Sequence, residues 1–132
     1  MTSRERKIPG PEHPITIKDA SARVVARVGT RVLADTTKAL TLREASYPPV
    51  HYIPIDDVDQ SLLAASDTST YCPYKGDASY YTINLPDGVL ADAVWFYPEP
   101  YDAVAPITGH VAFYTDRVDV AMATVPADTL EH

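Results

Sequence analysis

Short runs in which apolar and polar residues alternate recur along this chain from Ile15 onward. Alternation with a period of two is typical of a β-strand with one buried face. Twelve prolines and five glycines divide the 132 residues into short pieces, which disfavours long helices. Because the strand-like runs are not followed by helices, the chain lacks the βαβ crossovers of a Rossmann-like fold. The sequence therefore predicts a mainly β, mostly antiparallel fold.

A chain of 132 residues favours one small domain, and that length supports a hydrophobic core without disulfides. The strands can form a barrel or packed sheets, and the pattern leaves both open. We expect residues 1–13 to form a flexible N-terminal tail, residues 14–126 the single β domain, and residues 127–132 a C-terminal tail. The final Leu-Glu-His of this tail resembles the beginning of an expression tag.

One segment, Asp56–Ala65, has a helical pattern. Asp56 can cap its first turn, and Val58, Leu62 and Leu63 form an apolar side. We therefore expect one short helix beside the strands.

The net charge of −7 limits the partners that this chain can take. A negative field repels phosphate backbones and anionic lipid surfaces, so nucleic acid and membranes are not expected as partners. No segment approaches the roughly 20 apolar residues that span a bilayer, and the N-terminus has no apolar signal region. We expect a cytoplasmic protein, and the oligomeric state is left open.

The aromatic residues are concentrated in the middle and later parts of the chain. All nine tyrosines, both phenylalanines and Trp95 lie between Tyr47 and Tyr114, and the first 46 residues contain none. A tyrosine ring packs while its hydroxyl seeks water, a partner or a ligand. The concentration indicates a groove lined by phenols, although tyrosines also simply favour strands.

The two-residue period of a strand assigns these rings to faces. Trp95 and Tyr97 share one face, and Phe96 faces the opposite side. Adjacent Tyr80 and Tyr81 also face opposite sides, so one of them at most can line a given cleft.

The segment from Cys72 to Gly76 contains the chain's single cysteine in a predicted turn. Pro73 favours the second position of a β-turn, which places Cys72 at the first and Lys75 at the fourth. Gly76 accepts a positive φ where the chain re-enters a strand. If the side chains converge, the ammonium favours the nucleophilic thiolate, which makes Cys72 and Lys75 candidate catalytic residues. The alternative is a small buried cysteine beside a solvated lysine.

The Cys-Pro-x-Lys-Gly turn, together with the segments around Glu44, Tyr52 and Trp95, resembles a known bacterial family, the domain of unknown function 427 (DUF427). The resemblance extends from about Ile17 to Val120, and its Cys-Pro-x-Lys-Gly block is fairly specific. It rests on the ordered positions Glu44, Tyr52, Pro54, Asp57, Val58, Cys72, Pro73, Lys75, Gly76, Ala78, Tyr80, Trp95, Tyr97 and Phe113.

The resemblance implies a compact all-β domain similar to the tent-like fold of several zinc-binding modules, and it implies no known activity. The family sometimes carries a nucleotidyltransferase label. Asp57 and Asp59 have the spacing of a metal-binding carboxylate pair, but no Gly-Ser turn precedes them and a helix start explains them. Nucleotidyl transfer is therefore the less favoured activity.

Metal and cofactor sites are not predicted. A structural zinc site needs about four Cys or His ligands, and one cysteine with the scattered His13, His51 and His110 offers no chelating pairs. A Cys-His nucleophilic pair stays open, with His51 or His110 as the base.

Two hypotheses follow for function. The first is a small-molecule-binding domain with an aromatic pocket around the Cys-Pro-x-Lys-Gly turn, with an enzymatic form through Cys72 and Lys75. The second is a non-catalytic interaction or scaffold module that binds a protein through an exposed aromatic patch. The ligand-binding residues expected for the first are Glu44, Tyr52, Tyr80, Trp95 and Tyr97.

Overall fold

The structure is a computed structural model of the chain, described for residues 6–123. The predicted C-terminal tail, with its tag-like end, lies outside the described residues. Within them the chain forms ten strands and three short 3-10 segments. The strands are β1 (Ile15–Asp19), β2 (Arg23–Val28), β3 (Arg31–Thr36), β4 (Leu40–Glu44), β5 (Val50–Pro54), β6 (Leu63–Cys72), β7 (Gly76–Leu85), β8 (Gly88–Phe96), β9 (His110–Phe113) and β10 (Asp119–Ala123). The 3-10 segments are η1 (Ile55–Asp57), η2 (Gln60–Leu62) and η3 (Asp102–Ile107).

The strands form two antiparallel sheets. The larger has the order β1-β4-β5-β9-β8-β7-β6, and the smaller has the order β10-β2-β3. Neither sheet closes on itself, so the packed-sheet alternative holds and the barrel does not. The prediction of a small, mainly β, antiparallel domain is confirmed.

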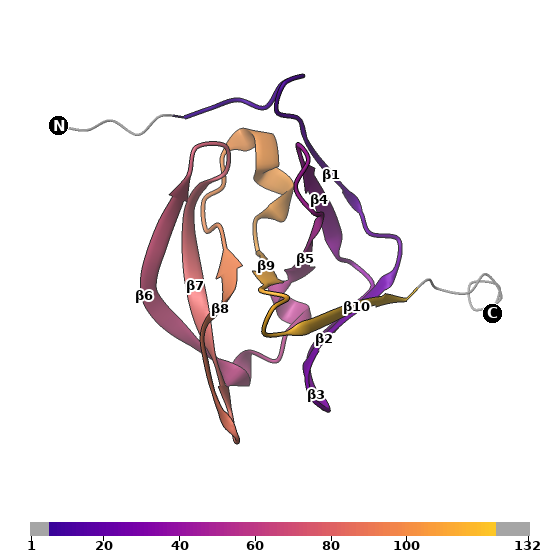
Figure 1. Cartoon of the computed structure of the whole chain (residues 1–132), viewed down its shortest axis with the longest axis vertical. Coiled ribbons are helices and arrows are strands. Elements are labelled where there is room, and N and C mark those ends of the chain that lie inside the picture. The colour runs from indigo at the N-terminus through magenta and orange to yellow at the C-terminus, as the bar shows by residue number, and fades with distance from the viewer. Residues whose placement is uncertain (1–5, 124–132) are drawn as a thin grey trace.

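The larger sheet bends at β9. This strand pairs with β5 and with β8 through two residue pairs each, whereas β6, β7 and β8 pair along most of their length. Figure 1 shows the long β6–β7–β8 portion facing the β1–β4–β5 portion, with β9 between them and η3 over one end. The bend therefore brings side chains from both portions toward one another.

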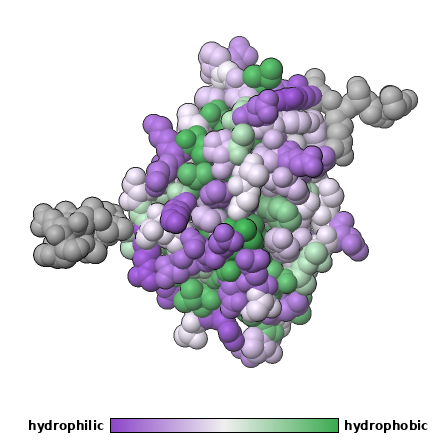
Figure 2. Space-filling view, turned by 180° about the vertical axis from the view of Figure 1, so that it is seen from behind, coloured by the Kyte–Doolittle hydropathy of each residue, from purple (hydrophilic) through white to green (hydrophobic). Residues whose placement is uncertain are grey.

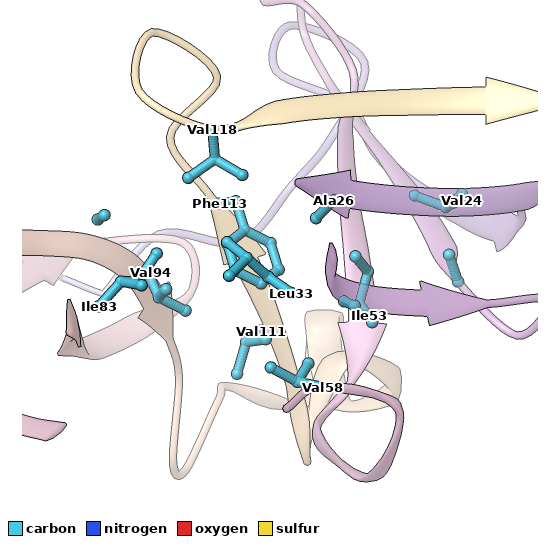
Figure 3. Close-up of a cluster of buried hydrophobic side chains, with 13 residues drawn as sticks. Val24, Ala26, Leu33, Ile53, Val58, Ile83, Val94, Val111, Phe113 and Val118 are labelled. Atoms are coloured by element: carbon cyan, nitrogen blue, oxygen red, sulfur yellow. The ribbon is translucent and has the colours of Figure 1, made fainter. Parts of the chain in front are cut away.

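The first hydrophobic core fills the space between the two sheets. Figure 3 shows Val24 and Leu33 of the smaller sheet packed toward Ile53, Val111 and Phe113 of the larger one. These side chains are at most 4% exposed. Burying such a side chain stabilises the fold by roughly 1.5–3 kcal/mol. The smaller sheet contributes only aliphatic residues to this core, as the lack of early aromatic residues predicts.

A second core lies on the opposite face of the same strands. It contains Tyr52, Tyr80 and Tyr97, which are buried with Leu42 and Ile107. Neighbouring residues of a strand point to opposite faces, so β5, β7, β8 and β9 contribute side chains to both cores, whereas β1 and β4 contribute to the second. The second core contains the candidate site.

The predicted helix at Asp56–Ala65 is wrong. The segment forms two single 3-10 turns, and from Leu63 it continues as β6, where Leu63 and Ala65 pair with β7. Asp59, and not Asp56, caps a turn here: its carboxylate accepts from the Ser61 backbone N–H at 3.2 Å, at the start of η2. Pairing with the hairpin partner outweighs the weak helical preference of so short a segment.

Candidate functional site

The turn between β6 and β7 has the predicted geometry. The Lys75 backbone N–H donates to the Cys72 carbonyl at 3.2 Å, and Gly76 has a φ of +110°. A side chain at Gly76 would be strained at that φ, and its Cβ would stand 3.4 Å from the Glu99 carbonyl oxygen. The prediction of a Cys72-to-Lys75 turn followed by a glycine with positive φ is confirmed.

Two separate segments hold this turn in place. On one side the Lys7 backbone N–H donates to the Pro73 carbonyl at 2.8 Å, and on the other the Tyr101 N–H donates to the Lys75 carbonyl at 3.0 Å. The ring of His13 stacks on Tyr74 with centroids 4.1 Å apart. The N-terminal segment from residue 6 to residue 13 thus contributes contacts to the site, which its polar sequence did not indicate.

The turn directs Lys75 inward to an ion pair with Glu44 on β4. The two side chains are 11% and 12% exposed, and the other carboxylate oxygen of Glu44 bonds to His13 Nε2 at 2.8 Å. Burial acts to raise the pKa of Glu44, but the hydrogen bonds from Lys75 and His13 outweigh it, so this pKa lies below its ordinary value. Glu44 is therefore ionised at neutral pH, with both oxygens occupied.

A pocket of about 240 Å³ opens beside this ion pair. It lies where the two portions of the bent sheet meet, and six of the seven predicted site residues line it. The lining residues are Leu42, Glu44, Tyr47, Pro48, Val50, Tyr52, Lys75, Tyr80, Trp95, Tyr97 and Tyr114. The sequence did not indicate the other five lining residues, because the direction in which their side chains point depends on the β4–β5 connection and on the bend at β9. These residues are Leu42, Tyr47, Pro48, Val50 and Tyr114.

Cys72 is the predicted site residue that does not line the pocket. It is half-buried and packs against the second core. Its sulfur lies 3.9 Å from Lys75 Nζ. The cysteine and the lysine therefore do converge, while the pocket wall itself is formed by the lysine.

The rings of the pocket are locked by contacts with one another. Trp95 Nε1 donates to the Tyr52 hydroxyl at 3.2 Å, and the two rings meet edge to face at 84°. Trp95 also packs on Tyr114 with centroids 4.5 Å apart. Tyr80 shares a hydrogen bond of 2.8 Å with Thr70. These contacts preorganise the wall, which lowers the cost of ordering it around a ligand.

The strand-facing predictions for these rings are confirmed. Trp95 and Tyr97 belong to the second core, whereas Phe96 packs against the first. Tyr80 faces the pocket, and its neighbour Tyr81 stacks on Phe96 at 4.7 Å on the other side. Tyr80 and Tyr81 are thus matched neighbours in opposite environments.

Burial keeps the pocket phenols protonated. It is the largest influence on Tyr52 and on Tyr97 and raises the pKa of each well above its ordinary value. Burial, with the hydrogen bond to Tyr80, raises the pKa of Tyr114 to about 12. A neutral phenol retains its O–H, so these side chains can donate hydrogen bonds at physiological pH.

A wider cavity of about 670 Å³ adjoins the pocket. The shared wall includes Glu44, Trp95 and Tyr114, and the wider cavity adds Phe113 and Val120. A molecule that fills the inner pocket can therefore extend outward over an apolar surface.

The two histidines considered as bases for Cys72 do not line the pocket. His51 borders the adjoining wider cavity and not the pocket; its Nδ1 bonds to Thr41 Oγ1 at 2.9 Å, and burial lowers its pKa. His110 Nδ1 bonds to the Thr108 carbonyl at 3.0 Å. The histidine that contacts the site is His13, which bonds to Glu44. Its position in the polar N-terminal segment did not indicate this contact.

The acidic pair after β5 also lies apart from the pocket wall. Asp57 accepts from Thr36 Oγ1 at 2.6 Å, and Asp59 accepts from Ser61 Oγ at 2.5 Å. Among residues 6–123 no three His, Cys, Asp or Glu side chains gather in a way that could hold a metal ion. The helices over the same residues are too short and too polar to cross a bilayer.

Comparison with known proteins gives a family and no named function. No curated protein matches the chain. A family model described as a domain of unknown function, DUF427, matches residues 16–124. This range includes every predicted site residue and all ten strands except the first residue of β1. The chain belongs to the DUF427 family.

Proposed function

We propose that this protein binds a small molecule in the pocket formed by the turn after β6 and by β4, β5, β7 and β8. The observation that supports this most directly is the pocket wall itself, which gathers Lys75, Glu44 and Trp95 with three buried tyrosines from distant parts of the sequence. Ligand sites are commonly concave, lined by apolar and aromatic surface, and equipped with a few polar groups that orient the ligand.

The volume indicates the size of the ligand. A cavity of about 150 Å³ holds benzene, so 240 Å³ accommodates roughly one ring with a polar substituent. Larger ligands would extend into the adjoining cavity beside Phe113 and Val120. The proposed ligand is therefore a compact, planar molecule or the planar end of a longer one.

The burial of the rings favours a pocket over a flat protein-binding patch. Tyr52, Tyr97 and Tyr80 are 1%, 7% and 9% exposed, and a partner protein could not lie against them. Tyr47, at 62%, is the exposed aromatic residue at the rim. The face seen in Figure 2 carries hydrophobic side chains in small groups among polar ones. These observations support the small-molecule proposal over the scaffold alternative.

The enzymatic form of the proposal uses Cys72 as a nucleophile beside Lys75. The sulfur is 3.9 Å from the ammonium, so the positive charge of Lys75 lies beside the atom that would attack a substrate. Alkylation with iodoacetamide tests this form. We expect Cys72 to react in the native protein and to react more slowly after Lys75→Met. A thiol that stays inert until the protein is denatured would remove Cys72 from the chemistry and leave ligand binding unaffected.

Nucleotidyl transfer is supported least. The candidate carboxylates Asp57 and Asp59 are engaged in local hydrogen bonds and do not line the pocket. Lys75, the cation nearest the pocket, is paired with Glu44.

Thermal denaturation against a panel of small metabolites tests the proposal, because a ligand that binds the folded state raises Tm by mass action. Val50→Phe places a ring in the pocket mouth and should abolish the shift given by any hit. Val32→Phe, at a position that is 43% exposed and outside the pocket, is the control and should preserve it. A shift that survives Val50→Phe would place binding elsewhere, and the absence of any hit would contradict the proposal.

A further inference from the structure

We propose that the pocket selects a planar ligand whose buried edge carries hydrogen-bond acceptors, a carbonyl or carboxylate group, and that it rejects ammonium ligands. This inference rests on the proposed function and names the class of ligand for the same pocket. It follows from counting which polar atoms on the wall remain able to donate or to accept.

The hydroxyl of Tyr97 is the most informative group. The residue is 7% exposed and lines the pocket. Within residues 6–123 no hydrogen bond or other side-chain contact gives this hydroxyl a partner, and no deeply buried polar side-chain atom there is unsatisfied. The hydroxyl oxygen is therefore not sealed from solvent, and because Tyr97 lines the pocket we infer that the hydroxyl faces this space. A phenol in this position is available to bond a ligand.

Two further donors face the same space. The Tyr52 hydroxyl accepts from Trp95, which leaves its own hydrogen for another acceptor. Lys75 has three N–H donors, of which one is directed to Glu44 and one lies near Cys72 Sγ. Tyr52 and Lys75 thus add to the donor capacity of Tyr97.

Acceptors are scarce by comparison. The phenol oxygens on the wall can accept weakly as neutral groups, but Glu44 is the one carboxylate among the lining residues, and its two oxygens are bonded to Lys75 and His13. An incoming ammonium would have to displace Lys75 from an ion pair that is almost nine-tenths buried, which leaves a buried charge unpaired. The aromatic walls alone attract a cation by about 1–2 kcal/mol, and the positive charge of Lys75 opposes that attraction.

The aromatic surface suits a planar molecule. Trp95, Tyr114 and Tyr80 present ring surface to the pocket, and Pro48 and Val50 add apolar contact near the mouth. A flat ring can pack against these groups while its polar substituent meets Tyr97, Tyr52 or Lys75. Carbonyl and carboxylate oxygens satisfy the donors that water otherwise occupies.

Three probes of similar size and shape test the class: benzamide, benzoate and benzylamine. Binding is measured by ligand-observed NMR and by isothermal titration calorimetry on the full chain. We expect benzamide or benzoate to bind, and benzylamine to bind at least tenfold more weakly. Tighter binding of benzylamine would overturn the ligand class while leaving the proposed pocket function intact. No binding by any of the three, together with an empty metabolite panel, would overturn both.

A matched pair of variants locates the hydrogen bond. Tyr97→Phe removes the free hydroxyl and should weaken binding of the acceptor probe by roughly 2- to 12-fold, the cost of one lost hydrogen bond. Tyr81→Phe removes a phenol on the opposite face, outside the pocket lining, and should leave the affinity unchanged. Circular dichroism and Tm establish that each variant is folded. Equal affinities for the wild type and a folded Tyr97→Phe variant would overturn the assignment.

Discussion

Lys75 and Glu44 stand 31 residues apart in the sequence, yet they form an ion pair whose side chains are only 11% and 12% exposed. The pair joins the turn after β6 to the end of β4, and so joins the two portions of the bent sheet. One wall of the pocket is therefore held by electrostatic pairing as well as by packing. Its removal should affect both stability and the shape of the pocket.

Substitution of Lys75 tests this relationship. Lys75→Met keeps most of the volume and leaves Glu44 without Lys75. We expect the free energy of unfolding to fall by about 2–4 kcal/mol, somewhat less than the roughly 3–5 kcal/mol for a fully buried pair, because Glu44 keeps its bond to His13. Urea denaturation measures the change. Lys38→Met, at an exposed lysine, is the matched control and should change stability by no more than about 0.5 kcal/mol. Equal stabilities for the two variants would contradict a structural role for the pair.

The lowered pKa of Glu44 predicts a pH dependence. A carboxyl whose pKa is depressed in the folded state contributes stability that is present above its unfolded pKa, near 4.5, and is lost as pH falls through the folded pKa. The stability difference between the wild type and Glu44→Gln should therefore shrink as pH falls below about 4.5. Urea denaturation at pH 7 and pH 3 measures this, with exposed Glu99→Gln as the control. A stability difference between the wild type and Glu44→Gln that grows as pH falls would contradict a lowered pKa of Glu44 in the folded state.

Gly76 should tolerate substitution poorly. Its φ of +110° opposes a side chain, and a Cβ added there would stand 3.4 Å from the Glu99 carbonyl oxygen, so Gly76→Ala should cost about 1–3 kcal/mol. Gly10→Ala is the control, because a Cβ at Gly10 meets no heavy atom within 4 Å. Thermal denaturation compares the two. An unchanged Tm for Gly76→Ala would show that the turn can relax without loss.

Tyr114 predicts a change at high pH. Its pKa of about 12 lies above the ordinary value of 10, so the folded state holds its proton longer than the unfolded state and loses stability as pH rises from about 10 to 12. In the Tyr114→Phe variant, the loss of stability that the ionisation of Tyr114 causes should disappear. The Tyr47→Phe variant, which changes an exposed ring, should still lose this stability at high pH. Denaturation at pH 9 and pH 11 distinguishes them. Identical alkaline profiles for the wild type and Tyr114→Phe would count against the burial of this phenol.

The turn from Cys72 to Gly76 and the sheet faces of the nearby aromatic residues were predictable from the sequence, because both depend on local backbone geometry. Pro73 and Gly76 define a turn through their own backbone preferences. The period of two in a strand separates Tyr80 from Tyr81 and groups Trp95 with Tyr97. These rules hold in any antiparallel sheet, so they need no knowledge of which strands pair.

The features that the sequence did not predict depend on tertiary pairing. β6 lies at the edge of the larger sheet, contains the polar run Ser66–Thr70 and has no fully buried residue. It therefore lacks the apolar alternation that marks a strand. Its pairing with β7 also replaced the expected helix at Leu63–Ala65. His13 reaches Glu44 across 31 residues, and nothing in a polar N-terminal segment indicates such a contact.

The fluorescence of Trp95 reports on ligand binding in the proposed pocket, because Trp95 is the chain's one tryptophan and lines that pocket. The titration uses whichever panel compound or acceptor probe raises Tm. We expect a saturable change in Trp95 emission whose midpoint matches the Kd from calorimetry, and we expect this change to be lost in the Val50→Phe variant. A compound that binds and stabilises the protein without changing the emission would show that its site lies elsewhere and would contradict ligand binding in the Trp95 pocket.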